Sequence, residues 1–236
     1  MPSLKNWDNH TWLSSKKYIQ SFNSFILKQK RLNKNSRILD IGCGRGKIIE
    51  NLSIKLKLIN KPIGLDIENH KDKSKKIIFK KTDAIIFMRK TKITFDLILI
   101  KQTIHLLEIS QIIKLLIMCK NKLNPGGKII ILSLDPDNNE IPTFLIMDKK
   151  LKNSLKRDRK IFNLIIKIFK SVIIKNYIFK VKILKKEYTE MIKKRYISTL
   201  LNFNDKQIID GINEINSKYK KELKFKDRLT CLILNR

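Results

Sequence analysis

Three alternating glycines constrain the fold of this chain more than any other feature of its sequence. Residues 37–41 are a short apolar run typical of a buried strand, and Gly42, Gly44 and Gly46 follow it directly. Residues 47–58 then carry apolar side chains at helical spacing. A strand, a glycine turn and a helix in this order predict the first unit of a nucleotide-binding α/β sheet.

The glycine turn also has chemical consequences. Glycines let the backbone turn tightly and let a ligand lie against main chain that a Cβ would block. The following helix offers unpaired N–H groups and the positive end of its dipole to an anionic group. Two common nucleotide sites do not fit, since the dinucleotide fingerprint requires glycine where Lys47 stands, and a P-loop requires Ser or Thr where Ile48 stands.

Further strands and helices are expected in alternation along the chain. Apolar and β-branched runs predict strands over residues 62–67, 76–80, 94–101, 128–134, 177–184 and 229–234. Helical spacing predicts helices over residues 15–30, 109–122, 142–170 and 205–221, and the apolar run 85–88 begins another. The sequence Asn-Pro-Gly-Gly at 124–127 predicts a turn that ends the helix before it.

Acidic residues stand close to the ends of these strands. Asp66 lies about 20 positions beyond the glycine turn, at the carboxyl end of the neighbouring strand. A carboxylate there can accept hydrogen bonds from both hydroxyls of a ribose, and capping of the next turn is the alternative. Asp83 follows the third strand and can cap the helix that begins there. Asp96 precedes the buried run 94–101 rather than ending it, which predicts a structural role.

Five features in the same order resemble the class I S-adenosylmethionine-dependent methyltransferases. They are the motif Asp40-x-Gly42-x-Gly44-x-Gly46, the acids Asp66 and Asp83, the buried strand 94–101, and the Leu-x-Pro-Gly-Gly turn into the next strand. The resemblance implies a Rossmann-like α/β fold. It would have a seven-stranded, mostly parallel sheet with helices on both faces, and the last strand would lie antiparallel beside the sixth.

The resemblance also implies S-adenosylmethionine as the cofactor. The glycine turn would cradle its methionine end with help from Asp40, while Asp66 would bind the ribose and Asp83 would accept a hydrogen bond from the adenine amino group. The cofactor-binding residues implied are Asp40, Gly42, Cys43, Gly44, Gly46, Asp66, Ile67, Asp83, Ala84 and Lys101.

By the same resemblance, the end of strand 94–101 faces the methyl group. His105 is therefore the candidate general base, with a packed histidine as the alternative. Gln102 is a candidate to orient the acceptor, with a contact to the cofactor as the alternative. Arg195 and Tyr196 are candidates to hold a substrate carboxylate or phosphate, and a surface ion pair is the alternative for Arg195.

The chain of 236 residues is expected to form a single methyltransferase domain over 1–236. We expect an N-terminal helical cap over 1–35, a cofactor-binding half over 36–135 and a substrate-side half over 136–236. The cap contains the candidate lid, in which Trp12 is expected to contact substrate and His10 is a second possible base; its members are Trp7, Asn9, His10 and Trp12.

The formal charge of +31 suggests a nucleic acid or an anionic surface as partner. Most of the excess is lysine spread along the chain, however, as a compositional bias towards lysine, isoleucine and asparagine would produce. Arginine clusters with interleaved aromatic residues, typical of nucleic-acid readers, are absent from the sequence. The expected acceptor is therefore a small molecule. The alternatives are an RNA or tRNA methyltransferase that uses the basic surface, and a cofactor-binding protein without catalysis.

Several motifs that would indicate another kind of active site or a membrane location are missing from the sequence. There is no Asn/Asp-Pro-Pro-Tyr/Phe motif after strand 94–101, no Pro-Cys nucleophile and no metal-ligand spacing of His, Cys and Asp. No stretch approaches the ~20 uncharged apolar residues that a membrane span needs. The cysteines Cys43, Cys119 and Cys231 are scattered, which predicts free thiols in a reducing cytoplasm.

Overall fold

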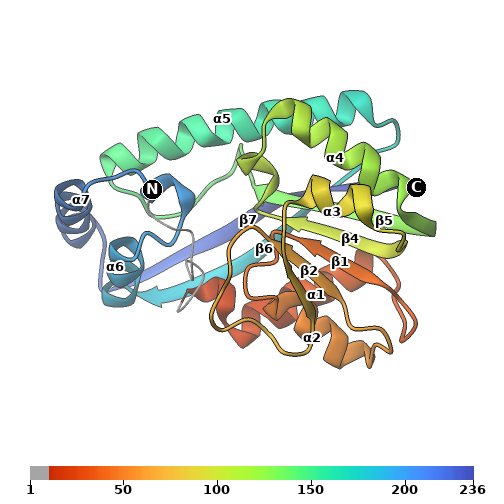
Figure 1. The fold of residues 1–236 in the computed structure, drawn as a ribbon. Coiled ribbons are helices and arrows are strands. Elements are labelled where there is room, and N and C mark those ends of the chain that lie inside the picture. Colours follow the sequence, from red (N-terminus) through yellow and green to blue (C-terminus); the bar gives the residue numbers. More distant parts are fainter. Residues whose placement is uncertain (1–10) are drawn as a thin grey trace.

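The computed structural model describes residues 11–236, and its strands form one seven-stranded sheet in the order β3-β2-β1-β4-β5-β7-β6 (Figure 1). Neighbouring strands from β3 to β5 pair in parallel, whereas β7 pairs antiparallel with both β5 and β6. This confirms the predicted Rossmann-like sheet. The strands are β1 (Ile38–Ile41), β2 (Ile63–Asp66), β3 (Ile78–Lys81), β4 (Phe95–Lys101), β5 (Leu123–Leu134), β6 (Ile173–Leu184) and β7 (Glu222–Asn235).

Helices cover both faces of the sheet. Figure 1 shows α1 (Lys16–Gln29) and α2 (Lys47–Leu56) below it, and α3 (Ala84–Lys90), α4 (Ile109–Asn121) and α5 (Leu145–Ile168) above it. Helices α6 (Lys185–Lys193) and α7 (Asp205–Lys218) lie together at one end of the molecule. Three short 3-10 helices complete the structure: η1 (Trp12–Ser14), η2 (Ile104–Leu106) and η3 (Ser198–Leu200).

Alternation along the central strands divides the core in two. In β4, Leu97 and Leu99 join the cluster that packs against α1 and α2, whereas Ile98 and Ile100 join the cluster under α3, α4 and α5. All four side chains are fully buried. Strands with apolar residues on both faces are typical of parallel sheets covered by helices. Packing on both faces holds these strands, and therefore the positions of their carboxyl ends, in place.

Several predicted boundaries differ from the structure; β6, for example, begins at Ile173 rather than 177. The residues 124–127, predicted as a turn, belong to β5, because Leu123 already pairs with Phe95 before a register shift in the ladder. A Cβ on Gly127 would lie 2.9 Å from the Phe95 carbonyl oxygen, so glycine permits this close approach. The last strand begins at Glu222 rather than 229, since it pairs with β6 from Glu222 to Ile233 and most of its charged residues alternate with buried ones.

Residues 185–193 form α6, for which no helix was predicted. Its apolar face is short, and its lysines mask the periodicity. Residues 1–10 lie outside the described residues, and with them the candidate lid residues Trp7, Asn9 and His10. Among residues 11–236, none of the helices combines the length and apolar character that crossing a membrane requires.

Candidate active site

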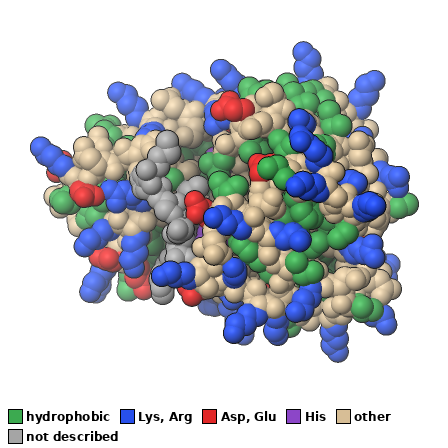
Figure 2. Space-filling view, viewed as in Figure 1, with side chains coloured by type: hydrophobic (Ala, Val, Ile, Leu, Met, Phe, Trp, Pro, Cys, Tyr) green, Lys and Arg blue, Asp and Glu red, His purple; other side chains and the backbone are tan. Residues whose placement is uncertain are grey.

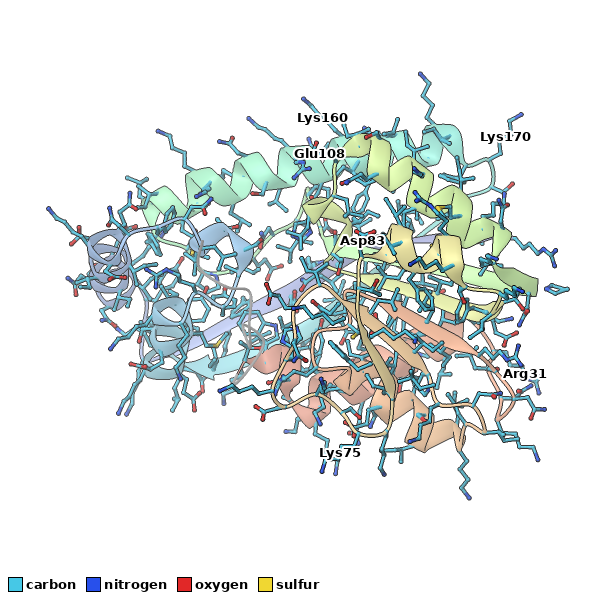
Figure 3. The ribbon with its side chains drawn as sticks, in the orientation of Figure 1. Arg31, Lys75, Asp83, Glu108, Lys160 and Lys170 are labelled. Carbon is cyan, nitrogen blue, oxygen red and sulfur yellow. The ribbon has the colours of Figure 1, made fainter. Side chains whose placement is uncertain are left out.

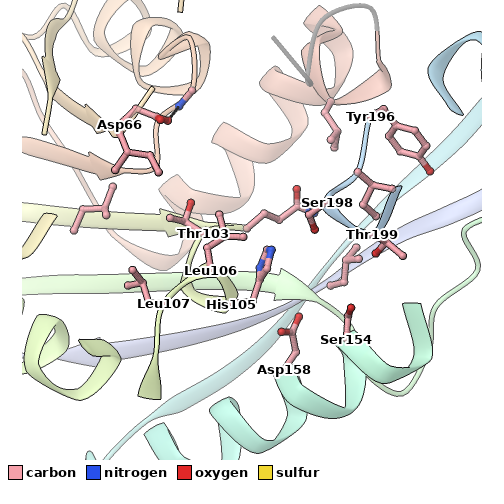
Figure 4. Close-up of a pocket in the computed structure, with 18 of the residues that line it drawn as sticks. Asp66, Thr103, His105, Leu106, Leu107, Ser154, Asp158, Tyr196, Ser198 and Thr199 are labelled. Atoms are coloured by element: carbon pink, nitrogen blue, oxygen red, sulfur yellow. Dashed lines mark hydrogen bonds between the residues drawn. The ribbon is translucent and has the colours of Figure 1, made fainter. Parts of the chain in front are cut away.

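A cavity of about 300 Å³ lies at the carboxyl ends of β1, β2 and β4 and extends to α5 and η3 (Figure 4). Ligands of open α/β sheets bind at this edge of the strands. Residues from widely separated segments therefore meet in its walls. The polar and aromatic side chains among them are Trp12, Asp66, His70, Thr82, Asp83, Gln102, Thr103, His105, Ser154, Arg157, Asp158, Tyr196, Ser198, Thr199 and Asp227.

The three glycines of the turn serve two different purposes. A Cβ on Gly42 would collide with the Thr103 side chain, whereas Gly46 has a φ of 73°, which favours glycine, so the local structure requires glycine at both positions. A Cβ on Gly44 would meet no atom within 4 Å. Because Gly44 also lines the cavity, it is the position at which bare main chain borders open space.

Asp66 is held at the end of β2 by two backbone donors. The Gly44 N–H donates to Oδ2 and the Glu68 N–H donates to Oδ1, both at 2.9 Å, and His70 Nε2 lies 3.6 Å from Oδ2. Burial raises the pKa of the Asp66 carboxyl, but the His70 imidazole and these backbone groups outweigh burial and lower it. The carboxylate is therefore charged at pH 7. Each oxygen has a second lone pair, so turn capping leaves capacity for ligand hydroxyls.

Asp83 stands where the sequence predicts, at the N-terminus of α3. Its Oδ1 accepts a hydrogen bond from the Ile86 N–H at 3.0 Å, so it caps the helix. Asp83, Ala84 and Ile67 line the same cavity as Asp66. Ile67 is 60% exposed and lies at the rim.

Four predicted cofactor residues do not line the cavity: Asp40, Cys43, Gly46 and Lys101. Burial raises the pKa of Asp40 to about 7, against the opposing charge of Lys101. The Lys101 ammonium lies 5.3 Å and 5.6 Å from the ring centres of Tyr18 and Phe22, on the α1 side of the sheet. The Cys43 sulfur packs against Gly64, where a Cβ would approach it to 2.7 Å.

The segment after β4 forms the middle of the cavity wall. Gln102 has a φ of 51°, which is uncommon for a residue other than glycine, and both Gln102 and Thr103 line the cavity. The Arg157 guanidinium fixes η2 by donating to the carbonyl oxygens of His105 at 2.7 Å and Leu107 at 2.9 Å. Helix α5 therefore holds this segment in place.

Burial lowers the pKa of His105 to about 4, and the neighbouring Arg157 charge adds to the effect. Its Nδ1 has no hydrogen-bond partner among the described residues. The imidazole is therefore neutral at pH 7 and a weak proton acceptor, which favours a role in orienting a ligand over one as general base.

Trp12 and Asp227 join the two ends of the described chain inside the cavity wall. The indole Nε1 donates to Asp227 Oδ2 at 2.9 Å, whereas Asp227 Oδ1 has no partner within residues 11–236. Burial raises the pKa of Asp227, while Trp12 and Lys101 act in the opposite direction. Tyr196 packs edge-on against Trp12 at 5.4 Å between ring centres.

The two neighbouring candidates Arg195 and Tyr196 occupy different environments. Tyr196 lines the cavity, and its hydroxyl lies 2.9 Å from that of Tyr188. Arg195 lies outside the lining, where its guanidinium donates to the Phe203 carbonyl oxygen at 3.1 Å and to Asp205 at 2.7 Å. Arg195 thus forms an ion pair with Asp205, which was the alternative to binding substrate.

Several lining residues have no counterpart in the sequence-based predictions: Ser154, Asp158, Ser198, Thr199 and Asp227. A signal for Asp158 does exist in the sequence. Leu151, Leu155, Asp158 and Phe162 follow the 4-3-4 spacing of the buried stripe of α5, so this aspartate stands where an apolar residue is expected.

Replacing Trp12 with phenylalanine is expected to lower the free energy of unfolding by about 2 kcal/mol, because Asp227 Oδ2 loses its indole donor in a buried position. Urea denaturation measures the change. A double-mutant cycle with Asp227→Leu, which cannot accept a hydrogen bond from the indole, separates the hydrogen bond from the smaller ring. Strictly additive effects in the cycle would contradict the assigned interaction.

The sequence model of the methyltransferase domain family matches residues 14–163. The structure of the putative methyltransferase from an antibiotic biosynthesis pathway of Anabaena variabilis aligns over 89% of this chain and 95% of its own, with 15% identity and a TM-score of 0.60.

The plantazolicin methyltransferase BpumL, solved with a pentazolic desmethylPZN analogue and SAH, aligns over 98% of this chain and 89% of its own, with 19% identity and a TM-score of 0.53. A SAM-dependent methyltransferase from Archaeoglobus fulgidus aligns over 92% and 94%, with 21% identity and a TM-score of 0.51. No curated protein sequence matches the chain significantly. At these identities the structural neighbours establish a shared fold.

Proposed function

The chain belongs to the methyltransferase domain family, and from this premise we propose that it transfers a methyl group from S-adenosylmethionine to a small-molecule acceptor. The resemblance to class I methyltransferases is confirmed by the family match and by the fold. When bound, this cofactor supplies an electrophilic methyl group on a sulfonium. The protein contributes proximity, alignment and exclusion of water.

The observation on which the proposal depends is the pairing of Gly44 with Asp66. Bare main chain borders the cavity at Gly44, and the Asp66 carboxylate, joined to it by a hydrogen bond, keeps lone pairs for two hydroxyls. These features fit a ligand that has a ribose and must lie against backbone. Ile67, Asp83 and Ala84 would hold the base on the adjoining wall.

The volume and the walls of the cavity favour a small acceptor. Its volume of about 300 Å³ is within the range of small-molecule pockets, and its walls come from η2, η3, α5 and β7 as well as from the glycine turn. In the proposal, Gln102, His105, Trp12 and Tyr196 contact the acceptor. His105 orients it through a hydrogen bond from or to its neutral imidazole.

The basic surface gives less support to an RNA acceptor. Figure 2 shows lysine and arginine side chains spread over the face in view. In Figure 3, Arg31, Lys75, Lys160 and Lys170 point outward from different sides of the molecule. Within residues 11–236 none of the three cysteines forms a disulfide, and the proposed place of action is a reducing compartment such as the cytoplasm.

The test is to incubate the protein and S-adenosylmethionine with a cell extract freed of macromolecules, and to search by mass spectrometry for products heavier by one methylene group. A parallel reaction uses bulk tRNA at low and high salt. We expect methylated small molecules. Methylation of tRNA alone, lost at high salt, would replace the proposal with its RNA alternative. Tight binding of S-adenosylhomocysteine without any product would instead indicate a non-catalytic protein.

A further inference from the structure

We propose that Asp158 binds the protonated nitrogen of an amine acceptor and removes its proton, so that nitrogen is the atom methylated. The inference deepens the proposed function and depends on it, because it assigns the acceptor end of the same cavity. Asp158 belongs to α5, far in the sequence from the glycine turn and from the residues that hold the cofactor end.

Asp158 is a buried acid without a partner in the described chain. It is 7% exposed and lines the cavity, and within residues 11–236 it has neither a hydrogen bond nor an ion pair. Its two neighbouring arginines bind elsewhere: the Arg157 guanidinium donates to the carbonyl oxygens of His105 and Leu107, and Arg159 donates to the Pro136 carbonyl oxygen. A buried carboxylate is costly unless a cation or hydrogen-bond donor compensates it. A bound ammonium group would supply both.

The position of Asp158 suits an acceptor group. Figure 4 shows Asp158 and Ser154 pointing from α5 towards the cavity, with His105 close by and Asp66 on the opposite side. Thr103 and His105 lie between the two acids in this view. Asp66 belongs to the cofactor end of the proposal, and Asp158 therefore faces that end from across the cavity.

The cavity has the opposite charge balance to the rest of the protein. The whole chain has a formal charge of +31, yet the lining contains four aspartates, namely Asp66, Asp83, Asp158 and Asp227, and Arg157 as its arginine. The other titratable side chains of the lining are His70, His105 and Tyr196. At the α5 end of the cavity, an acidic wall in a basic protein favours a cationic acceptor over an anionic one, because a low-dielectric wall strengthens the field.

Methylation of a protonated amine releases one proton, which Asp158 accepts in the proposal. The ammonium passes a proton to a carboxylate oxygen of Asp158, which frees the nitrogen lone pair. The lone pair forms a C–N bond with the methyl carbon as the C–S bond breaks, and that bonding pair returns to sulfur. Burial raises the pKa of Asp158 to about 7, against the neighbouring Arg157 charge, so the acid can take up and return a proton near neutral pH.

The test uses calorimetry with the protein saturated in S-adenosylhomocysteine. The probes are primary amines from methylamine to phenethylamine, each paired with the alcohol and the carboxylate of the same carbon skeleton. We expect at least one amine to bind at least about 10-fold more tightly than its two counterparts. Asp158→Asn should abolish that preference and leave the affinity for S-adenosylhomocysteine unchanged.

The matched control is Ser154→Ala, one turn earlier on the same wall, which removes a hydroxyl but no charge and should keep the amine preference. A panel in which no amine exceeds its counterparts, or an Asp158→Asn variant that retains the preference, would overturn the assignment. If the unmodified protein does not bind S-adenosylhomocysteine, the proposed function is overturned instead. As an activity readout, a deuterated methyl donor added to extract should label nitrogen rather than oxygen or sulfur.

Discussion

Replacing Asp66 with alanine is expected to weaken binding of S-adenosylhomocysteine by roughly 100-fold, as measured by calorimetry. A hydrogen bond to a charged acceptor contributes about 1.5 kcal/mol or more, and loss of two ribose hydroxyl contacts gives about 3 kcal/mol. The substitution also removes the acceptor of the Gly44 N–H, which holds the glycine turn against β2.

Asp72→Ala is the control for this experiment, because Asp72 is an exposed aspartate in the loop that follows. The Asp72→Ala variant should bind S-adenosylhomocysteine with the same affinity as the unmodified protein. Urea denaturation of both variants separates lost binding from lost folding. An unchanged affinity in a folded Asp66→Ala variant would mean that the ribose contact has been assigned to the wrong residue.

The Asp158→Asn variant is expected to change how stability depends on pH. Burial raises the pKa of Asp158 from 3.8 to about 7. Between these values the unfolded chain has released this proton while the folded protein still holds it, so the free energy of unfolding falls as pH rises. Full separation of the two pKa values corresponds to roughly 4 kcal/mol. Asparagine does not titrate, and the variant should lack this decline.

The measurement is the difference in unfolding free energy between variant and unmodified protein, obtained in urea at several pH values from 4 to 8. The difference should increase with pH in favour of the variant and level off above about 7. Asp40 also lowers the free energy of unfolding as pH rises, and His105 raises it. Both residues are present in the variant and in the unmodified protein, so their contributions to the pH dependence cancel in the difference. A flat difference would show that Asp158 titrates normally.

The part of the cavity that we propose for the cofactor could be predicted because its features are local in the sequence. A strand end, Gly44 and a second strand end at Asp66 are enough to place main chain beside a carboxylate, and the structure joins them by a hydrogen bond. Asp83 likewise follows from the start of a helix. For Lys101, the alternation of β4 was the overlooked signal. It shares a face with Leu97 and Leu99, so its side chain lies on the α1 side and not in the cavity.

The part of the cavity that we propose for the acceptor depends on tertiary structure. Asp158, Thr199 and Asp227 come from α5, η3 and β7, and only packing brings these elements to one wall. The length of β7 was underestimated because charged residues alternate with buried ones before Leu229, whereas the run from Leu229 onward is continuously apolar. An aspartate on the buried stripe of α5 is the local exception that could have been recognised.

The link between Trp12 and Asp227 spans 215 positions of the chain. A ribosome that has not yet translated β7 has already made the glycine turn and Asp66, but not Asp227 or the strand that joins β5 to β6. The two ends of the cavity are thus synthesised in a fixed order, with the donor end first. Premature termination before Glu222 would yield a polypeptide that has every residue assigned to the methyl donor and an unfinished wall for the acceptor.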